Sequence, residues 1–197
     1  SHTKQIITFG SREYENTRPN VKYVLCRDEQ HLLKEFMVFW QQNYPDVLTG
    51  WNTGLFDIPY LIKRLEREVG ESLASKISPW GFTNERKIFI MGNEETTYDI
   101  GGIAQLDYLD LYKKFTYQKQ ESYRLDNIAH VELGEKKLDY SEHETLHQLY
   151  KQDYQKFIEY NVKDVELVEK LEDKMKLIEL ALTLAYDNKV NYDDVFT

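Results

Sequence analysis

The chain has 197 residues, of which 41% are hydrophobic and 30% are charged, values that are ordinary for a globular protein with one hydrophobic core. The net charge of −9 argues against a protein that grips nucleic acid by itself, because phosphate contacts need clustered Lys and Arg. A nuclease site stays open, since bound metal ions reverse the local sign of carboxylates.

The cellular compartment is indicated by what the sequence lacks. No apolar run approaches the roughly 18 residues of a membrane span, and no secretory signal is visible. The single cysteine, Cys26, excludes an internal disulfide bond and fits a reducing cytoplasm. Ser1 and His2 resemble the remnant of an expression tag, so we expect one domain over residues 3–197.

The first half of the chain alternates between strand and helix patterns. Apolar and β-branched runs predict the strands, and apolar side chains at helical spacing predict the helices. The expected elements are, in order, strand 4–9, strand 21–26, a helix after Asp28 through Trp40, strand 47–49, and a helix from Ile58 to about Val69. Asp28 can cap the first helix and Gly70 can end the second.

The second half is richer in helix. The expected elements are an irregular segment at 71–85, a hairpin of 87–91 and 96–100 around Gly92–Glu95, a strand at 103–107, helices around 109–115 and 123–133, and two or three helices between 142 and 187. The hairpin prediction rests on a glycine-containing turn between two strand-like runs.

Asp57 follows a buried strand and a loop that contains Gly50, Asn52 and Gly54. Ile58-Pro59 then begins a helix, with proline where its missing N–H does no harm. Asp57 is therefore expected at the carboxyl end of a strand, where open α/β sheets usually place their ligands. The alternative is that Asp57 merely caps the helix.

A second candidate site lies in Tyr160-Asn-Val-Lys-Asp164, within a long helical pattern. Residues four apart project from one face of a helix, so the phenol of Tyr160 and the carboxylate of Asp164 are neighbours. Such a pair can hold a water molecule and a metal ion respectively.

Together, the Asn52…Phe56-Asp57 loop and the Tyr160…Asp164 helix resemble the second and third motifs of the 3′→5′ exonuclease domain of family B DNA polymerases. Residues 106–115 resemble the corresponding stretch in replicative polymerases of T-even-type phages, and the resemblance runs from about Lys22 to Thr197. It implies an α/β, ribonuclease H-like exonuclease fold, with a mixed sheet flanked by helices. The first strand of that fold is expected to be missing here.

The resemblance also implies roles for single residues. Asp57 and Asp164 would be catalytic carboxylates that hold metal ions, and Tyr160 would orient the attacking water. Lys137 aligns with a lysine near the scissile phosphate, and Asn52 and Phe56 with residues that position the terminal nucleotides of the DNA. The alternatives are a solvated surface charge for Lys137 and a packing role for Tyr160.

The implied chemistry is two-metal hydrolysis of a phosphodiester with Mg²⁺ or Mn²⁺, which prefer oxygen ligands. The family's first motif, an Asp-x-Glu that supplies two of its four acids, does not occur before Asp57. Glu13-Tyr14-Glu15 has the spacing but the wrong first acid. We therefore expect the metal site to be weak or empty in this chain, and the fragment to be inactive alone.

Other ionisable residues are not assigned to the site. Asp107 and Asp110 look like metal ligands, but the resemblance treats their segment as scaffold, so helix capping or surface pairing is expected. His143 and His147 are four apart on a predicted helix, yet nothing nearby completes a zinc set, and no zinc is expected.

The leading hypothesis is the proofreading part of a phage-type DNA-directed DNA polymerase, acting on a single-stranded DNA 3′ end beside the remainder of the polymerase chain. Its location would be the cytoplasm, of an infected bacterium if the source is a phage. The alternative is a non-catalytic module for nucleic-acid binding or assembly, such as one piece of a split polymerase. A third hypothesis is a self-sufficient nuclease that uses Glu13 or Glu15.

Overall fold

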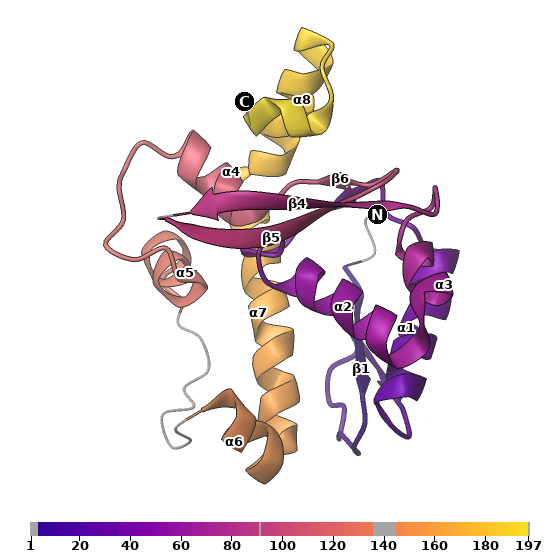
Figure 1. Ribbon diagram of the computed structural model, residues 1–197. Coiled ribbons are helices and arrows are strands. Elements are labelled where there is room, and N and C mark those ends of the chain that lie inside the picture. The colour runs from indigo at the N-terminus through magenta and orange to yellow at the C-terminus, as the bar shows by residue number, and fades with distance from the viewer. Residues whose placement is uncertain (1–3, 91, 136–144, 197) are drawn as a thin grey trace. The chain divides into compact units, whose positions relative to one another are not determined.

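The computed structural model describes residues 4–90, 92–135 and 145–196 (Figure 1). The chain divides into two compact units. Unit 1 combines the residues up to Leu32 with Gln120–Met175, and unit 2 combines Leu33–Lys119 with the residues from Lys176 onward. Among the described residues, no helix is both long and apolar enough to cross a membrane.

The described residues of unit 1 form a small sheet and three helices. Strands β1 (Ile6–Gly10) and β2 (Val21–Leu25) pair in parallel, with Ile6 opposite Val21. The helices are α5 (Leu125–Leu133), α6 (Leu146–Gln152) and α7 (Tyr154–Met175). Helices α5 and α6 pack against α7, the long helix of this unit (Figure 1).

The core of unit 1 joins the sheet to α7. Its buried residues are Ile6, Val21, Ile158 and Val162. Partly buried aromatic rings extend it: Tyr14, Tyr23, Tyr154 and Phe157. Because Ile158 and Val162 lie on the side of α7 that faces the sheet, the other sides of this helix face away from the sheet.

In the described part of unit 2, four strands form two pairs. Strands β3 (Val47–Leu48) and β6 (Ala104–Gln105) pair in parallel. Strands β4 (Thr83–Ile90) and β5 (Asn93–Ile100) form an antiparallel hairpin, with Gly92 at a φ of 86° between them. Glycine adopts such a positive φ without a steric penalty.

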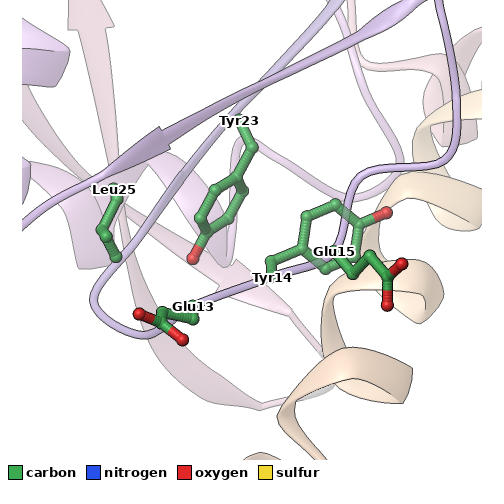
Figure 2. A pocket seen from close by; sticks show the side chains of 5 residues that line it. All are labelled: Glu13, Tyr14, Glu15, Tyr23 and Leu25. Atoms are coloured by element: carbon green, nitrogen blue, oxygen red, sulfur yellow. The ribbon is translucent and has the colours of Figure 1, made fainter.

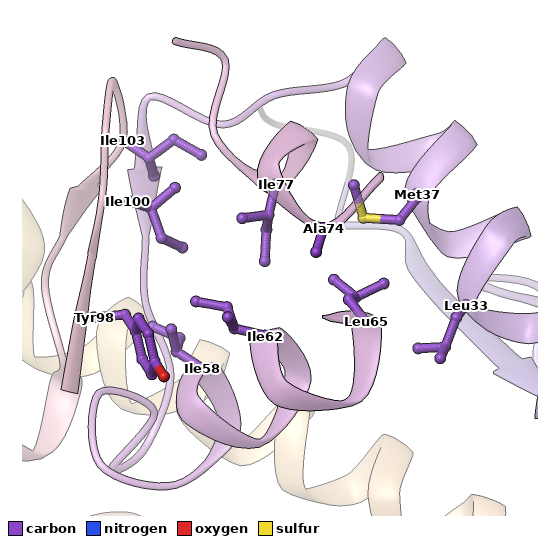
Figure 3. Packing of buried hydrophobic residues seen from close by; sticks show 10 residues of the cluster. All are labelled: Leu33, Met37, Ile58, Ile62, Leu65, Ala74, Ile77, Tyr98, Ile100 and Ile103. Atoms are coloured by element: carbon purple, nitrogen blue, oxygen red, sulfur yellow. The ribbon is translucent and has the colours of Figure 1, made fainter. Parts of the chain in front are cut away.

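Unit 2 also contains helices. They are most of α1 (Glu29–Gln42), which crosses the unit boundary, with α2 (Asp57–Val69), α3 (Glu71–Ala74), η1 (Ser75–Ile77), α4 (Tyr108–Phe115), α8 (Leu177–Asn188) and η2 (Tyr192–Phe196). Their core gathers side chains from α1, α2, α3, η1 and β5 and from the turn after β5 (Figure 3): Leu33, Met37, Ile58, Ile62, Leu65, Ala74, Ile77, Tyr98, Ile100 and Ile103. This packing fixes α2, whose first residue is Asp57.

Most expected elements are present, with shifted boundaries. The main error lies at 71–85, which was expected to be irregular. Gly70 ends α2 at a φ of 89°, and its carbonyl then accepts hydrogen bonds from the N–H groups of Leu73 and Ala74, which starts α3. The expected strand at 103–107 is also shorter, because Asp107 leaves the strand to cap α4.

The mixed α/β class is confirmed. Among the described residues the strands pair as three two-stranded sheets, β1–β2, β3–β6 and β4–β5. The ribonuclease H-like arrangement around one mixed sheet, without its first strand, stays a prediction, as does the assignment of residues 3–197 to a single exonuclease domain.

Candidate active site

Asp57 is the first residue of α2 and follows the loop of residues 49–56. The N-cap position belongs to Phe56, whose side chain makes no capping hydrogen bond. The loop turns tightly, because the N–H of Phe56 donates to the carbonyl of Asn52 (3.2 Å) and the N–H of Ile58 to that of Thr53 (2.9 Å). The side chain of Asp57 is exposed, and Asp57 occupies the first helical position rather than the capping position.

The pKa of the Asp57 carboxyl is raised above its ordinary value, chiefly because neighbouring protein atoms restrict its hydration. The nearby negative charge of Asp107 raises it further, against a hydrogen bond from its own backbone N–H. A group can be exposed and still lose part of its hydration shell when it lies against a loop. These surroundings therefore favour the protonated form of Asp57 more than water favours that of a free carboxyl group.

Asn52 and Phe56, which the resemblance assigns to the terminal nucleotides, both lie in this loop. Asn52 has a φ of 62°, in the left-handed region that residues other than glycine rarely occupy, although asparagine tolerates it better than most. The ring of Phe56 is 69% exposed. An exposed ring of this kind is suited to stacking on an unpaired base.

Asp107 caps α4, as expected, because its carboxylate accepts a hydrogen bond from the N–H of Leu109 (3.0 Å). The same carboxylate also accepts hydrogen bonds from the loop before Asp57, so it does more than cap a helix. Asp110 is exposed, yet its pKa is raised, chiefly because neighbouring atoms restrict the hydration of its carboxylate. The charge of Asp107 raises this pKa further, and the charge of Lys113 opposes the shift.

Tyr160 and Asp164 both lie on the uninterrupted helix α7, which confirms that they are one turn apart on one helix face. Tyr160 is 7% exposed, and Asp164 is half-buried. This burial is compatible with a phenol held in place for chemistry and with a packing role.

The charged neighbours of this pair along α7 are engaged in ion pairs within unit 1. Arg18 bridges Glu159 (2.8 Å) and Glu166 (2.7 Å). Glu135 bridges Lys163 and Lys170, both at 2.6 Å, and these two lysines lower the pKa of Glu135 to about 2. Ion pairs on both sides of Asp164 thus tie α7 to the segments around it.

Lys137, His143 and the remainder of 136–144 lie outside the described residues, so the role of Lys137 stays a prediction. Asp57 belongs to unit 2 and Asp164 to unit 1, and their convergence on one metal pair also stays a prediction. Within 4–90, 92–135 and 145–196, no group of three His, Cys, Asp or Glu side chains is arranged to hold a metal ion.

Glu13 and Glu15 line a shallow cavity of about 430 Å³ in unit 1, together with Tyr14, Tyr23 and Leu25. Figure 2 shows the two carboxylates on either side of Tyr14. Both glutamates are exposed, and neither belongs to a potential metal-binding group among the described side chains. The hypothesis of a self-sufficient nuclease gains no support from this arrangement.

The chain matches the family model for the exonuclease domain of DNA polymerase family B over residues 2–128. It is 39% identical over 175 residues to the DNA-directed DNA polymerase of Escherichia phage RB69, and the aligned region covers 89% of this chain and 19% of that protein. It is 33% identical over 177 residues to the DNA-directed DNA polymerase of Enterobacteria phage T4, and that aligned region covers 90% of this chain and 20% of the phage protein.

A more distant relative is the DNA polymerase of Choristoneura fumiferana nuclear polyhedrosis virus, 26% identical over 182 residues. The chain spans about a fifth of the length of the phage polymerases that it matches. Because the family model matches well over half of the chain, the protein belongs to the family B DNA polymerases, and its matched part is their exonuclease domain.

Proposed function

We propose that this chain is the proofreading part of a phage replicative DNA polymerase and that, within the complete protein, it removes nucleotides from a single-stranded DNA 3′ end. The observation that carries the proposal is the family match, which includes the loop with Asp57, together with the 39% identity to a phage polymerase. The remainder of the polymerase would supply most of the DNA-binding charge, since this chain carries a net charge of −9. The site of action would be the cytoplasm of the infected bacterium.

The residues present fit a divalent metal ion such as Mg²⁺ or Mn²⁺. Asp57 offers an exposed carboxylate next to the capping position of α2, and Asp164 offers a second carboxylate in the middle of α7. Both metal ions prefer oxygen ligands. Bound in a pair, such ions supply a nucleophile at neutral pH and stabilise the leaving 3′ oxygen.

The protein's own side chains would place the substrate. Asn52 and Phe56 would hold the terminal nucleotides, with the exposed ring of Phe56 stacked on a base. The phenol of Tyr160 would orient the attacking water, from a position one turn before Asp164. These chemical roles follow from the family resemblance.

Lys137 would approach the scissile phosphate as a mobile point charge. We expect Lys137→Ala in the complete polymerase to slow excision more than it weakens DNA binding, because negative charge builds up in the transition state. The measurement is single-turnover excision beside equilibrium binding of the same strand. Unchanged excision would reduce Lys137 to a surface residue.

The test of the proposed function is excision of a 3′-labelled single strand by the complete polymerase. Asp57→Ala and Asp164→Ala should each lower the rate roughly 10³-fold or more, since each removes a metal ligand worth several kcal/mol in the transition state. DNA synthesis by the same variants should continue. Normal excision in both variants would favour the alternative of a non-catalytic module.

The 197-residue chain by itself is proposed to be a poor nuclease. It supplies two of the four carboxylates that the resemblance implies, and Mg²⁺ gives up its water reluctantly to so few ligands. Robust excision by the isolated chain that disappears in Asp57→Ala would contradict this. In that case Glu13 and Glu15 are the first residues to replace.

A further inference from the structure

We propose that Asp107 is a positioning residue for this site, whose carboxylate holds the loop of residues 49–56 in the shape that presents Asn52 and Asp57. The inference rests on the proposed function, because it assigns the loop to nucleotide and metal binding. Asp107 itself is not assigned any contact with DNA or metal.

The first argument is the number of hydrogen bonds that reach one side chain. Its Oδ1 accepts from the N–H groups of Asn52 (2.9 Å) and Leu109 (3.0 Å). Its Oδ2 accepts from the N–H of Gly54 (3.1 Å) and from the hydroxyl of Thr53 (3.4 Å). A helix cap needs only the bond to Leu109, so three of the four hydrogen bonds serve the loop.

The second argument concerns the backbone of the loop. The N–H groups of Asn52 and Gly54 converge on one carboxylate, and a charged acceptor forms stronger hydrogen bonds than a neutral one. Asn52 is held at a φ of 62°. A residue in this sparsely populated region keeps its conformation only when its surroundings over-determine it.

The third argument is that further hydrogen bonds fix the loop to the same elements. The hydroxyl of Thr97, in β5, donates to the carbonyl of Gly54 (2.9 Å). The N–H of Tyr108, the first residue of α4, donates to the carbonyl of Gly50 (2.8 Å). The loop between β3 and α2 is thus tied to β5 and to the start of α4, and Asp107 is its central tie.

The experiment compares Asp107→Asn with Asp110→Asn in the complete polymerase. Both variants lose one negative charge near α4, but Asp110 is exposed and does not hold the loop. In Asp107→Asn an amide NH₂ replaces one acceptor oxygen, so it cannot accept all four bonds. We expect kcat/KM for excision to fall roughly 10- to 100-fold, with little change in DNA synthesis. Asp110→Asn should excise normally.

A readout that does not depend on activity is hydrogen exchange of the loop amides. Exchange at Asn52 and Gly54 should become faster in Asp107→Asn and stay unchanged in Asp110→Asn. A merely structural role would instead lower the melting temperature and reduce DNA synthesis and excision together.

Thr97 provides a variant that changes no charge and so leaves the electrostatics of Asp57 alone. Thr97→Val removes the hydrogen bond to Gly54, and Thr97→Ser keeps it. Excision should fall in the valine variant and return in the serine variant. This pair decides the question if Asp107→Asn does not fold.

Two results would overturn the proposal: normal excision in Asp107→Asn despite fast exchange of the loop amides, or equal excision by Thr97→Val and Thr97→Ser. Failure of the proposed function is distinguishable from both. If Asp57→Ala keeps full excision, the site assignment is wrong, whatever the loop amides do.

Discussion

The two regions that carry the proposed catalytic carboxylates are held by different kinds of interaction. Asp57 follows an irregular loop whose backbone is tied by hydrogen bonds to Asp107 and Thr97. Asp164 lies in the middle of α7, whose regular backbone hydrogen bonds fix it relative to Tyr160. Ion pairs at the surface of α7 add to this but do not set the helix geometry.

The difference indicates where each region is vulnerable. A loop has no repeating hydrogen-bond pattern, so the loss of one side-chain acceptor frees its backbone to move. A 22-residue helix tolerates the loss of one ion pair, because its internal hydrogen bonds remain. Substitutions near the loop should therefore lower the rate of excision, and substitutions at the ion pairs of α7 should lower the free energy of unfolding.

The largest effect on excision is expected when the carboxylates of the two regions are replaced, singly or together. Asp57→Ala and Asp164→Ala together, in the complete polymerase, should be hardly worse than either variant alone, because residues that act as one unit show strongly non-additive losses. The measurement is single-turnover excision by the two single variants and the double variant. Independent, multiplying losses would mean that the two carboxylates do not share one site.

Asn52→Gly separates the backbone of the loop from its side chain. Glycine adopts a φ of 62° freely and keeps the N–H that donates to Asp107, so stability should change by less than about 0.5 kcal/mol. Excision should still fall roughly tenfold, the equivalent of one lost hydrogen bond to a charged substrate.

The control for this prediction is Asn52→Ala. It removes the same side chain but places a Cβ in the left-handed region, which should cost about 1 kcal/mol of additional stability. Denaturant unfolding and excision are measured for both variants. Full excision by Asn52→Gly would show that the side chain does not contact the nucleotides.

Arg18→Gln tests the region of α7. Arg18 bridges two glutamates on this helix, and both partners are about one-fifth exposed. Its loss should lower the free energy of unfolding by about 1 kcal/mol, while the maximal rate of excision stays unchanged. Arg18→Lys keeps the charge but not the planar guanidinium group, so its free energy of unfolding should lie between those of the wild type and Arg18→Gln. A large loss of excision without a loss of stability would contradict the comparison.

The smallest effect is a dependence of stability on pH at Glu135. The folded-state pKa of Glu135 is lowered to about 2 from an ordinary value of 4.5, so its ion pairs with Lys163 and Lys170 stabilise the fold when the carboxyl is ionised. This contribution is fully present above about pH 4.5 and disappears as the pH falls through about 2. Because the three side chains are partly exposed, it should amount to less than about 1 kcal/mol.

The measurement is urea unfolding of the wild-type chain and Glu135→Gln at several pH values. The variant should be less stable near pH 6, and the gap should narrow as the solution is acidified. A gap that persists to pH 2 would point to packing by Glu135 rather than to its charge.

Local signals in the sequence were sufficient for several features. The resemblance led us to expect helix capping or surface pairing for Asp107, and the hydrogen bond from the N–H of Leu109 to its carboxylate confirms the helix cap at α4. The spacing of Tyr160 and Asp164 determined their common face on α7, because helix geometry depends only on residues a few positions apart. The second and third motifs were also sufficient to identify the family.

Only the tertiary structure decided how the loop before Asp57 is held. Asp107 lies 55 positions after Asn52, and no local pattern in the sequence indicates that its carboxylate accepts hydrogen bonds from that loop. The helical start of 71–77 escaped prediction for a different, local reason, since it depends on the conformation of Gly70 rather than on a capping side chain. Local hydrogen bonds and helical periodicity depend on residues close in the sequence, whereas contacts that close a long loop arise only when packing brings distant segments together.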